Sequence, residues 1–339
     1  MFVPVVDHSN QPLMPTIPSR ARRWIRDGKA TGFWKRGVFC VRLNVAPSAR
    51  QTQAIAVGID PGSKREGIVV ASAAHTYLNV QTLAVDWVQA AVATRRVMRR
   101  GRRYRKTPHR ANRRNRARGG IPPSTRARWQ WKLRLATWLA HMYPVSGFVV
   151  EDVAAPTKPD KRGWNRSFSP LEVGKRWFYG ELQKVAPVTT RQGWETQQYR
   201  AAVGLHKSRA KLAERWDAHC MDAWVLARSQ VGGASQPDNT ALLMITPLRF
   251  HRRQLHARQY AKGGVRRTYG GTRSGGFKRG SYVQHPKYGL CYVGGTMSGR
   301  ISLHALGDGH RLTQTARPTE VKFRTFASWR TRPAAPPAG

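Results

Sequence analysis

Three acidic residues and one histidine stand at points of the sequence where a catalytic site could form. The chain has only 17 acidic residues in 339, so an acid that ends an apolar segment needs a reason to be there. Asp60 follows the apolar run 54–59, and Glu151 ends the apolar run 147–151. Asp222 lies in an apolar helical stretch, three residues after His219. Residues at i and i+3 share a helix face, so these last two can point into one cleft.

Convergence of these carboxylates would favour a metal site. Three carboxylates repel one another unless cations bind them, and hard cations such as Mg²⁺ prefer oxygen ligands. Two such ions, with Mn²⁺ as a substitute, could activate water and stabilise the leaving oxygen in phosphodiester hydrolysis. The chemistry predicts Asp60, Glu151 and Asp222 as metal ligands, and His219 as a general base or a water-positioning group.

Each of these residues also has a structural interpretation. Asp60 precedes Pro61-Gly62 and could simply form a turn. Glu151 could pair with one of the many arginines, and His219 alone is more often a hydrogen-bonded structural residue than a catalyst. The combination is more specific than any single member.

The elements that must position these residues follow an α/β pattern. Apolar runs and helical periodicity predict the order β-β-β-α-β-α-β-α, with the first three strands forming a meander. The expected strands cover 54–59, 67–73, 77–87, 147–151 and 185–190, and the expected helices lie around 135–142, 173–184 and 213–228.

The strongly positive net charge indicates a polyanionic partner. With 60 Lys and Arg, the net charge is +43, which disfavours a compact state unless a polyanion neutralises it. A hydrophobic fraction of 40% is enough for folded cores, so a disordered basic protein is excluded. The intervals 87–150 and 239–307 contain no acid. We expect nucleic acid to contact Arg95, Arg96, Arg99, Arg100, Arg102, Arg103, Arg105, Arg110, Arg113, Arg114, Arg252, Arg253, Arg266, Arg267, Arg273, Lys278 and Arg279.

Two alternatives to nucleic-acid contact stay open at this stage. The first arginine block could be a solvated basic tail. Four tryptophans among basic residues could stack on bases or belong to the core; they are Trp164, Trp177, Trp194 and Trp216.

The cysteine spacing and the hydropathy of the chain indicate in which cellular compartment the protein is expected. Cys40, Cys220 and Cys291 are far apart and form no C-x-x-C pair, so no disulfide framework or cysteine zinc site is expected. The sequence has no secretion signal and no apolar stretch of the roughly 18 residues needed to span a bilayer. We therefore expect a cytoplasmic protein with no membrane partner.

Several short motifs give the chain a family resemblance. Pro12-Leu13-Met14-Pro15, followed by the basic stretch 19–29, resembles the N-terminal PLMP domain of the IscB and IsrB family of transposon-encoded RNA-guided nucleases. Residues 58–63, 149–151 and 219–223 are similar to the three RuvC motifs of that family, and the block 95–118 to its arginine-rich bridge helix.

The resemblance implies an RNase H-like (RuvC) core in which Asp60, Glu151, His219 and Asp222 are catalytic. It also implies a domain order, which we predict as a PLMP domain (1–50), RuvC part I (51–90), a bridge helix (91–120), RuvC parts II and III (121–231), a linker (232–245), a β-rich basic domain (246–330) and a disordered tail (331–339). The β-rich domain would hold guide RNA and read a short target-adjacent motif.

One departure from the family narrows the prediction. Members that cut both strands carry an HNH nuclease between the second and third RuvC motifs, but only residues 152–218 lie there, without an H-N-H arrangement. The sequence therefore resembles the IsrB branch, which implies a nick in the non-target strand. The implied partners are a guide RNA encoded near the gene and double-stranded DNA, with one protein chain per prokaryotic ribonucleoprotein, associated with the nucleoid when bound to DNA.

Other functions remain open on the sequence alone. A guide-independent, structure-specific RuvC-like nuclease would use the same chemistry. A non-catalytic nucleic-acid-binding accessory protein of the transposon, or a ribosomal-type RNA-binding protein, would explain the charge but not the acids.

Overall fold

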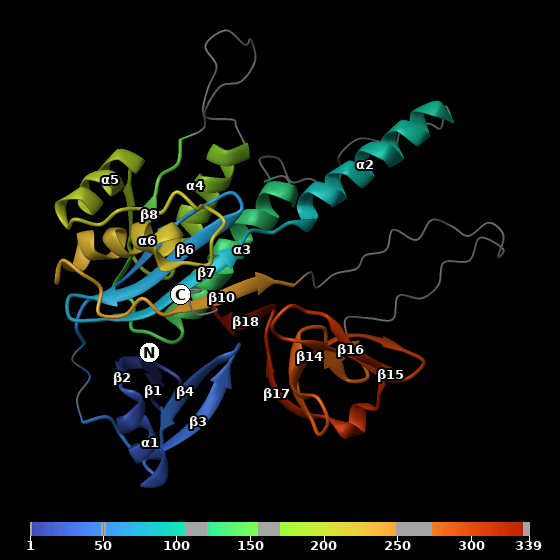
Figure 1. The fold of residues 1–339 in the computed structure, drawn as a ribbon, viewed down its shortest axis with the longest axis horizontal. Helices are drawn as coiled ribbons and strands as arrows, with labels where there is room; N and C mark the ends of the chain where they lie inside the picture. Colours follow the sequence, from blue (N-terminus) through green and yellow to red (C-terminus); the bar gives the residue numbers. More distant parts are fainter. Residues whose placement is uncertain are drawn as a thin grey trace.

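The protein has a mixed α/β fold built around one large sheet (Figure 1). The computed structural model describes residues 2–48, 50, 52–105, 121, 123–154, 170–248 and 273–334. A small N-terminal sheet and a C-terminal antiparallel sheet lie beside the large central sheet (Figure 1).

The central sheet has seven strands in the order β18-β10-β7-β6-β5-β8-β9. Strands β5 (Ile55–Asp60), β6 (Arg65–Ser72) and β7 (Thr76–Leu83) form an antiparallel meander, as predicted. Strand β8 (Gly147–Glu151) runs parallel to β5, and β9 (Val188–Arg191) runs parallel to β8. Parallel neighbours end at the same edge of a sheet, which is where Asp60 and Glu151 are found.

Helices cover both faces of this sheet, which explains why the central strands β5 and β8 are apolar on both sides. Helices α3 (Pro123–Ala140) and α4 (Pro170–Gln183) pack on the face that receives Ile55, Val57 and Ile59. Helix α6 (Trp216–Val231) packs on the opposite face, against Ala56 and Val69, and α5 (Gly193–Ala202) contacts α6. All six residues of β5 are buried.

The predicted element order is confirmed, but some bounds differ and one helix was not predicted. Helix α3 begins at Pro123, well before the helix expected around 135–142. The third strand ends at Leu83 rather than at residue 87, because Trp87 begins helix α2 (Trp87–Tyr104) and Val88 packs in the core from that helix. Helix α5 was not predicted. It is short and mostly polar, so it carries little apolar periodicity. A capping box between Gln192 and Glu195 marks its start.

Helix α2 leaves the body of the protein (Figure 1). It holds the first half of the arginine block. From residue 92 to the end of the helix, the residues whose burial the structure describes are exposed, apart from half-buried Gly101. Exposed apolar side chains such as Val97 and Met98 accompany the arginines. Beyond its first turn, where Val88 packs in the core, α2 therefore buries no apolar face of its own. The rest of the predicted bridge segment, 106–120, lies outside the described residues.

The N-terminal sheet has the order β2-β1-β4-β3. It consists of β1 (Val3–Val6), β2 (Pro12–Thr16), β3 (Ala30–Lys35) and β4 (Val38–Leu43), with helix α1 (Pro18–Arg26) between β2 and β3. The β3–β4 turn reaches the C-terminal sheet, where the Arg36 amide donates to Thr325 Oγ1 at 3.4 Å and the guanidinium lies 5.2 Å from the ring of buried Trp329.

The C-terminal sheet is antiparallel, in the order β16-β15-β14-β13-β17. This agrees with the β-rich region expected there. Its elements are the small hairpin β11 (Arg273–Ser274) and β12 (Phe277–Lys278), then β13 (Ser281–His285), β14 (Gly289–Met297), β15 (Arg300–Ala305), β16 (Arg311–Ala316), the 3₁₀ helix Pro318–Glu320 and β17 (Lys322–Phe326).

Two predicted boundaries differ from the structure. Strand β10 (Leu242–Pro247) begins inside the expected linker and pairs with β7, so this segment joins the central sheet. Strand β18 (Trp329–Pro333) pairs with β10, so residues 331–333 belong to a strand and not to a disordered tail. Of the described helices, none is long and apolar enough to cross a membrane.

The contact between α6 and the central sheet depends on a missing side chain. A Cβ atom at Gly58 would lie 1.8 Å from the carbonyl oxygen of Ala223 in α6. We predict that Gly58→Ala lowers the free energy of unfolding by about 3 kcal/mol, because the helix must move off the sheet. Gly180→Ala in α4, where nothing lies within 4 Å, should instead stabilise by up to about 1 kcal/mol. Urea unfolding of both variants tests this, and equal effects would contradict it.

Candidate active site

The acids and the histidine predicted from the sequence come from three adjoining elements. Asp60 ends β5 and Glu151 ends β8, and the register pairs Ile59 with Val150 just before them. Helix α6 carries His219 and Asp222 across β5 and β6. The close approach of α6 again needs glycine, because a Cβ atom at Gly67 would lie 2.3 Å from the carbonyl oxygen of His219.

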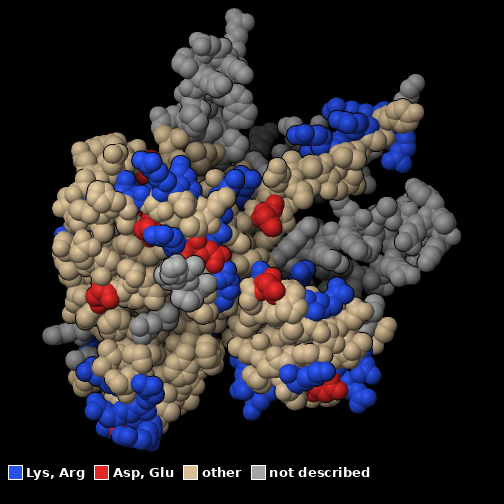
Figure 2. Space-filling model, viewed as in Figure 1, with Lys and Arg blue, Asp and Glu red and all other residues tan. Residues whose placement is uncertain are grey.

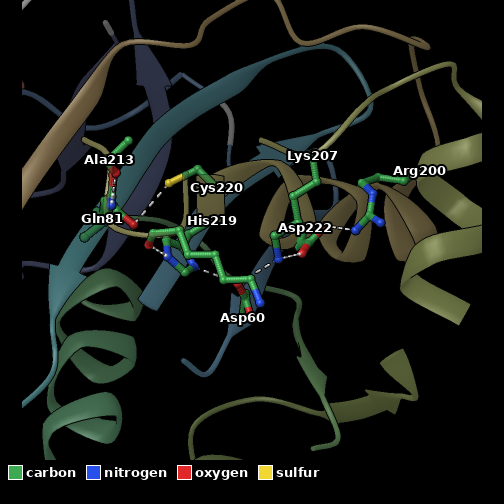
Figure 3. A network of polar contacts seen from close by, with 10 residues as sticks. Asp60, Gln81, Arg200, Lys207, Ala213, His219, Cys220 and Asp222 are labelled. Carbon is green, nitrogen blue, oxygen red and sulfur yellow. Dashed lines mark hydrogen bonds and ion pairs between the residues drawn. The ribbon is translucent and has the colours of Figure 1, made fainter. Parts of the chain in front are cut away.

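His219 joins α6 to the end of β5. Its Nδ1 lies 3.3 Å from Asp60 Oδ2, and its Nε2 lies 2.8 Å from the carbonyl oxygen of Lys211 (Figure 3). A carbonyl only accepts, so Nε2 carries a hydrogen and donates it. Nδ1 then donates to Asp60 when the ring is protonated, and has a lone pair for a proton when the ring is neutral. His219 is thus both hydrogen-bonded and placed to transfer a proton.

Asp222 is buried, with only 2% of its surface exposed, and two cations hold it. Arg200 of α5 donates to Oδ1, and Lys207 donates to Oδ2 (Figure 3). The Lys207 Nζ atom also lies 4.0 Å from Asp60 Oδ2. The ammonium group therefore bridges two of the three predicted metal ligands.

The pKa of the Glu151 carboxyl reflects its burial and the acids around it. Burial, followed by the proximity of Asp60 and Asp222, raises the pKa of Glu151 to about 8. A Cβ atom at Gly193, at the start of α5, would lie 3.1 Å from its Oε1. The side chain is thus packed between the other acids and a helix start, and a nearby cation would favour its ionised form.

The geometry argues against a purely structural role for Asp60 and for Glu151. The Asp60 carboxylate contacts His219 and Lys207, so its role is not confined to a turn. Within the described ranges, no arginine forms an ion pair with Glu151; Arg191, its partner in the strand register, lies near Glu195 instead, at 3.9 Å.

Arg200 and Lys207 were missed from the sequence. Both lie in the interval between the second and third motifs, and nothing in their spacing distinguishes them from the other cations of a chain with 60 Lys and Arg.

A further acid lies close to the site. Glu66 of β6 is 1% exposed, and its Oε1 accepts from Lys132 Nζ of α3 at 2.7 Å. Burial raises the pKa of Glu66, and Asp60 adds to this effect. Removal of Lys132 would leave the buried Glu66 carboxylate near Asp60 without a compensating charge. The Lys132–Glu66 pair therefore limits the excess of negative charge beside the site.

The predicted nucleic-acid contacts are only partly described. In α2, Arg95, Arg96, Arg99, Arg100 and Arg103 are exposed, as is Arg105 just after it. Arg102 lies in α2 too, and in the C-terminal hairpin Arg273 and Lys278 are exposed while Arg279 is half-buried. Figure 2 shows basic side chains along α2 and over the N-terminal sheet, where the arginines of α1 are exposed. Arg110, Arg113, Arg114, Arg252, Arg253, Arg266 and Arg267 lie outside the described residues.

The tryptophans divide between core and surface. Trp177 packs against the main core, and Trp216 donates to Asn79 at 3.0 Å. Trp194 is 62% exposed and follows Gly193, next to Glu151, so base stacking there stays a prediction. Trp164 lies outside the described residues.

The donor set fits a hard divalent cation, although its present arrangement does not form a complete site. Among residues that the structure describes, no three His, Cys, Asp or Glu side chains make a ready metal-binding group. The Lys207 ammonium lies between Asp60 and Asp222, where a shared cation would bridge them. Carboxylate oxygens are the ligands that Mg²⁺ prefers, so the residues fit such an ion once the ammonium gives way.

Comparison with known proteins adds a family match. Residues 3–164 match the family described as "RRXRR protein". This segment includes the PLMP motif, Asp60, α2 and Glu151. No curated protein matches the chain.

Several solved structures are similar to part of this chain. Thermus thermophilus RuvC in complex with a Holliday junction substrate is 13% identical with a TM-score of 0.29, covering 53% of this chain and 97% of that chain. A second structure of Thermus thermophilus RuvC is 12% identical with a TM-score of 0.26, covering 51% and 90%. The yeast mitochondrial Holliday junction resolvase Ydc2 is 14% identical with a TM-score of 0.28, covering 53% and 78%.

The raised pKa of Glu151 predicts a pH dependence of stability in the absence of metal. The folded-state pKa of about 8 lies above the ordinary value of 4.5, so the folded protein holds this proton more tightly than the unfolded chain. Stability should therefore fall as pH rises from about 4.5 to about 8. Glu151→Gln removes this contribution, so in EDTA its melting temperature relative to wild type should rise by a few degrees between pH 5 and pH 8. A pH-independent difference would contradict the assignment.

Proposed function

We propose that this protein is a metal-dependent nuclease whose active site consists of Asp60, Glu151, Asp222 and His219. The observation that carries the proposal is the convergence of three acids from the ends of β5 and β8 and from α6, in a chain with an overall charge of +43. The strand order, an antiparallel meander followed by two parallel strands, supports an RNase H-like core.

The roles of the residues follow from their chemistry. The three carboxylates would hold one or two Mg²⁺ ions, and such ions activate water and stabilise the leaving oxygen of a phosphodiester. His219 accepts or returns a proton at Nδ1, while its bond to the Lys211 carbonyl fixes the ring orientation. Burial of Asp60 and Asp222 keeps bulk water from competing for their oxygens.

The substrate class follows from the surface. Exposed arginines along α2, which buries little of its own surface, favour phosphate backbones as ligands. Such contacts fix position without reading sequence, so specificity would come from elsewhere. Binding through them should weaken steeply with salt, because counterions are released from the nucleic acid.

We further propose that a guide RNA supplies this specificity and that the reaction is a nick in the non-target strand. The PLMP motif in β2, the match of residues 3–164 to the RRXRR family and the arginine-rich α2 support this proposal. The interval 152–218 contains no H-N-H arrangement, which supports a single nuclease centre and a single cut. The target would be double-stranded DNA with a short adjacent motif.

Plasmid nicking tests the function directly. The full chain would be assembled with RNA transcribed from the DNA flanking its gene, and given a supercoiled plasmid with a guide-matched site and Mg²⁺. We predict an open-circular product whose rate falls at least about 100-fold in Asp60→Asn and in Asp222→Asn, because each substitution removes a metal ligand.

The matched control is Asp217→Asn. This residue is on the same helix but pairs with Arg215 outside the site, and nicking should be unchanged. Cleavage without RNA would contradict the guided mechanism and favour a guide-independent nuclease. Tight binding with no metal-dependent cleavage would contradict the assignment as a nuclease.

A further inference from the structure

Lys207 lies between two acids of the candidate site. Its ammonium group contacts Asp222 Oδ2 and lies 4.0 Å from Asp60 Oδ2, so it bridges an acid on β5 and an acid on α6. Its side chain is 29% exposed, against 3% for Asp222 and 9% for Asp60. A monovalent cation of the chain thus stands between two oxygen donors, on a side chain that is partly exposed to solvent.

The charges around Lys207 keep it ionised. It faces Asp60, Asp222 and Glu151, and on the other side of Asp222 lies Arg200. Burial acts to lower the pKa of Lys207, but the three acids outweigh burial and raise this pKa above its ordinary value. His219 contacts Asp60 from α6, and the charge of Glu66 is compensated by Lys132.

Lys207 is better suited to move than Arg200. Arg200 is held on helix α5, whereas Lys207 lies in the connection between α5 and α6, at residues 203–215. A lysine carries a compact charge on a flexible stem, so it can leave an acid without disturbing the backbone. Lys207 can therefore yield its place while Arg200 continues to hold Asp222 Oδ1.

We propose that Lys207 is a resident counter-cation that competes with the divalent metal for Asp60 and Asp222 and so sets the affinity of the site. The inference rests on the proposed metal-dependent nuclease. In the metal-free protein the ammonium offsets the repulsion among the acids, and metal binding displaces it. Lys207 is a positioning residue, since it acts through the acids.

Removal of this charge should have two opposite effects. Lys207→Gln should destabilise the metal-free protein, because the acids lose a compensating charge, and its melting temperature in EDTA should fall by a few degrees. The same substitution should strengthen metal binding about tenfold or more, because the metal no longer displaces a cation. A merely structural lysine would not give tighter metal binding when removed.

The experiment compares Mn²⁺ binding by full-length wild type and single-residue variants, including Asp60→Asn, all freed of nucleic acid. Free Mn²⁺ is followed by electron paramagnetic resonance during titration of wild type, Lys207→Gln and Arg209→Gln. Arg209 is exposed in the same connection, so its variant removes an equal charge and should bind Mn²⁺ like wild type. Lys207→Arg keeps the charge and should not bind Mn²⁺ more tightly than wild type. Lys207→Met, which also lacks the charge and has a side chain of similar length, stands in for Lys207→Gln if that variant fails to fold.

The outcomes separate this inference from the proposed function. Tighter Mn²⁺ binding by Lys207→Gln alone supports the counter-cation. Equal or weaker binding by folded Lys207→Gln, or tighter binding by Lys207→Arg, overturns it while leaving the metal site in place. If neither wild type nor any of these variants binds Mn²⁺, or if Asp60→Asn binds Mn²⁺ as tightly as wild type, the proposed metal site falls and this inference falls with it.

Discussion

Helix α6 lies directly against β5 and β6 because Gly58 and Gly67 have no side chains at the contact. This spacing decides the geometry of the site, since it brings His219 and Asp222 down to the level where β5 ends in Asp60. Strand β8 runs parallel to β5 and adds Glu151 at the same edge. One backbone constraint therefore assembles acids that are far apart in the sequence.

Assembly of these acids has an electrostatic cost, and the fold offsets it with internal cations. Lys207 and Arg200 hold Asp222, Lys207 extends to Asp60, and Lys132 pairs with the neighbouring Glu66. Burial, followed by the proximity of Asp60 and Asp222, raises the pKa of Glu151, which forms no ion pair with an arginine among the described residues. The site is thus a small acidic centre in a strongly basic protein. In the proposed function, the basic surface would attract a polyanion and the acidic centre would attract a divalent cation.

Much of the central fold could be predicted from the sequence because strands β5, β6 and β8 are apolar runs and its helical stretches are rich in apolar residues. The positions of Asp60 and Glu151 at strand ends were readable for the same reason. Lys207 and Arg200 were not readable, because their contacts depend on how α5 and α6 pack. The pairing of β10 with β18 was also missed, since it joins strands separated by the whole C-terminal sheet, and no local pattern marks so distant a partner.

In the proposed site, Asp60, Glu151 and Asp222 bind one metal centre, and the Lys207 ammonium occupies the metal position when no metal is bound. A crystal structure of the full chain with Mn²⁺, using the anomalous signal of the ion, tests it most directly. We expect an anomalous peak bound to oxygens of Asp60 and Asp222, with the Lys207 ammonium displaced from both. Absence of Mn²⁺ from these acids, with Lys207 still bridging them at saturating metal, would contradict it.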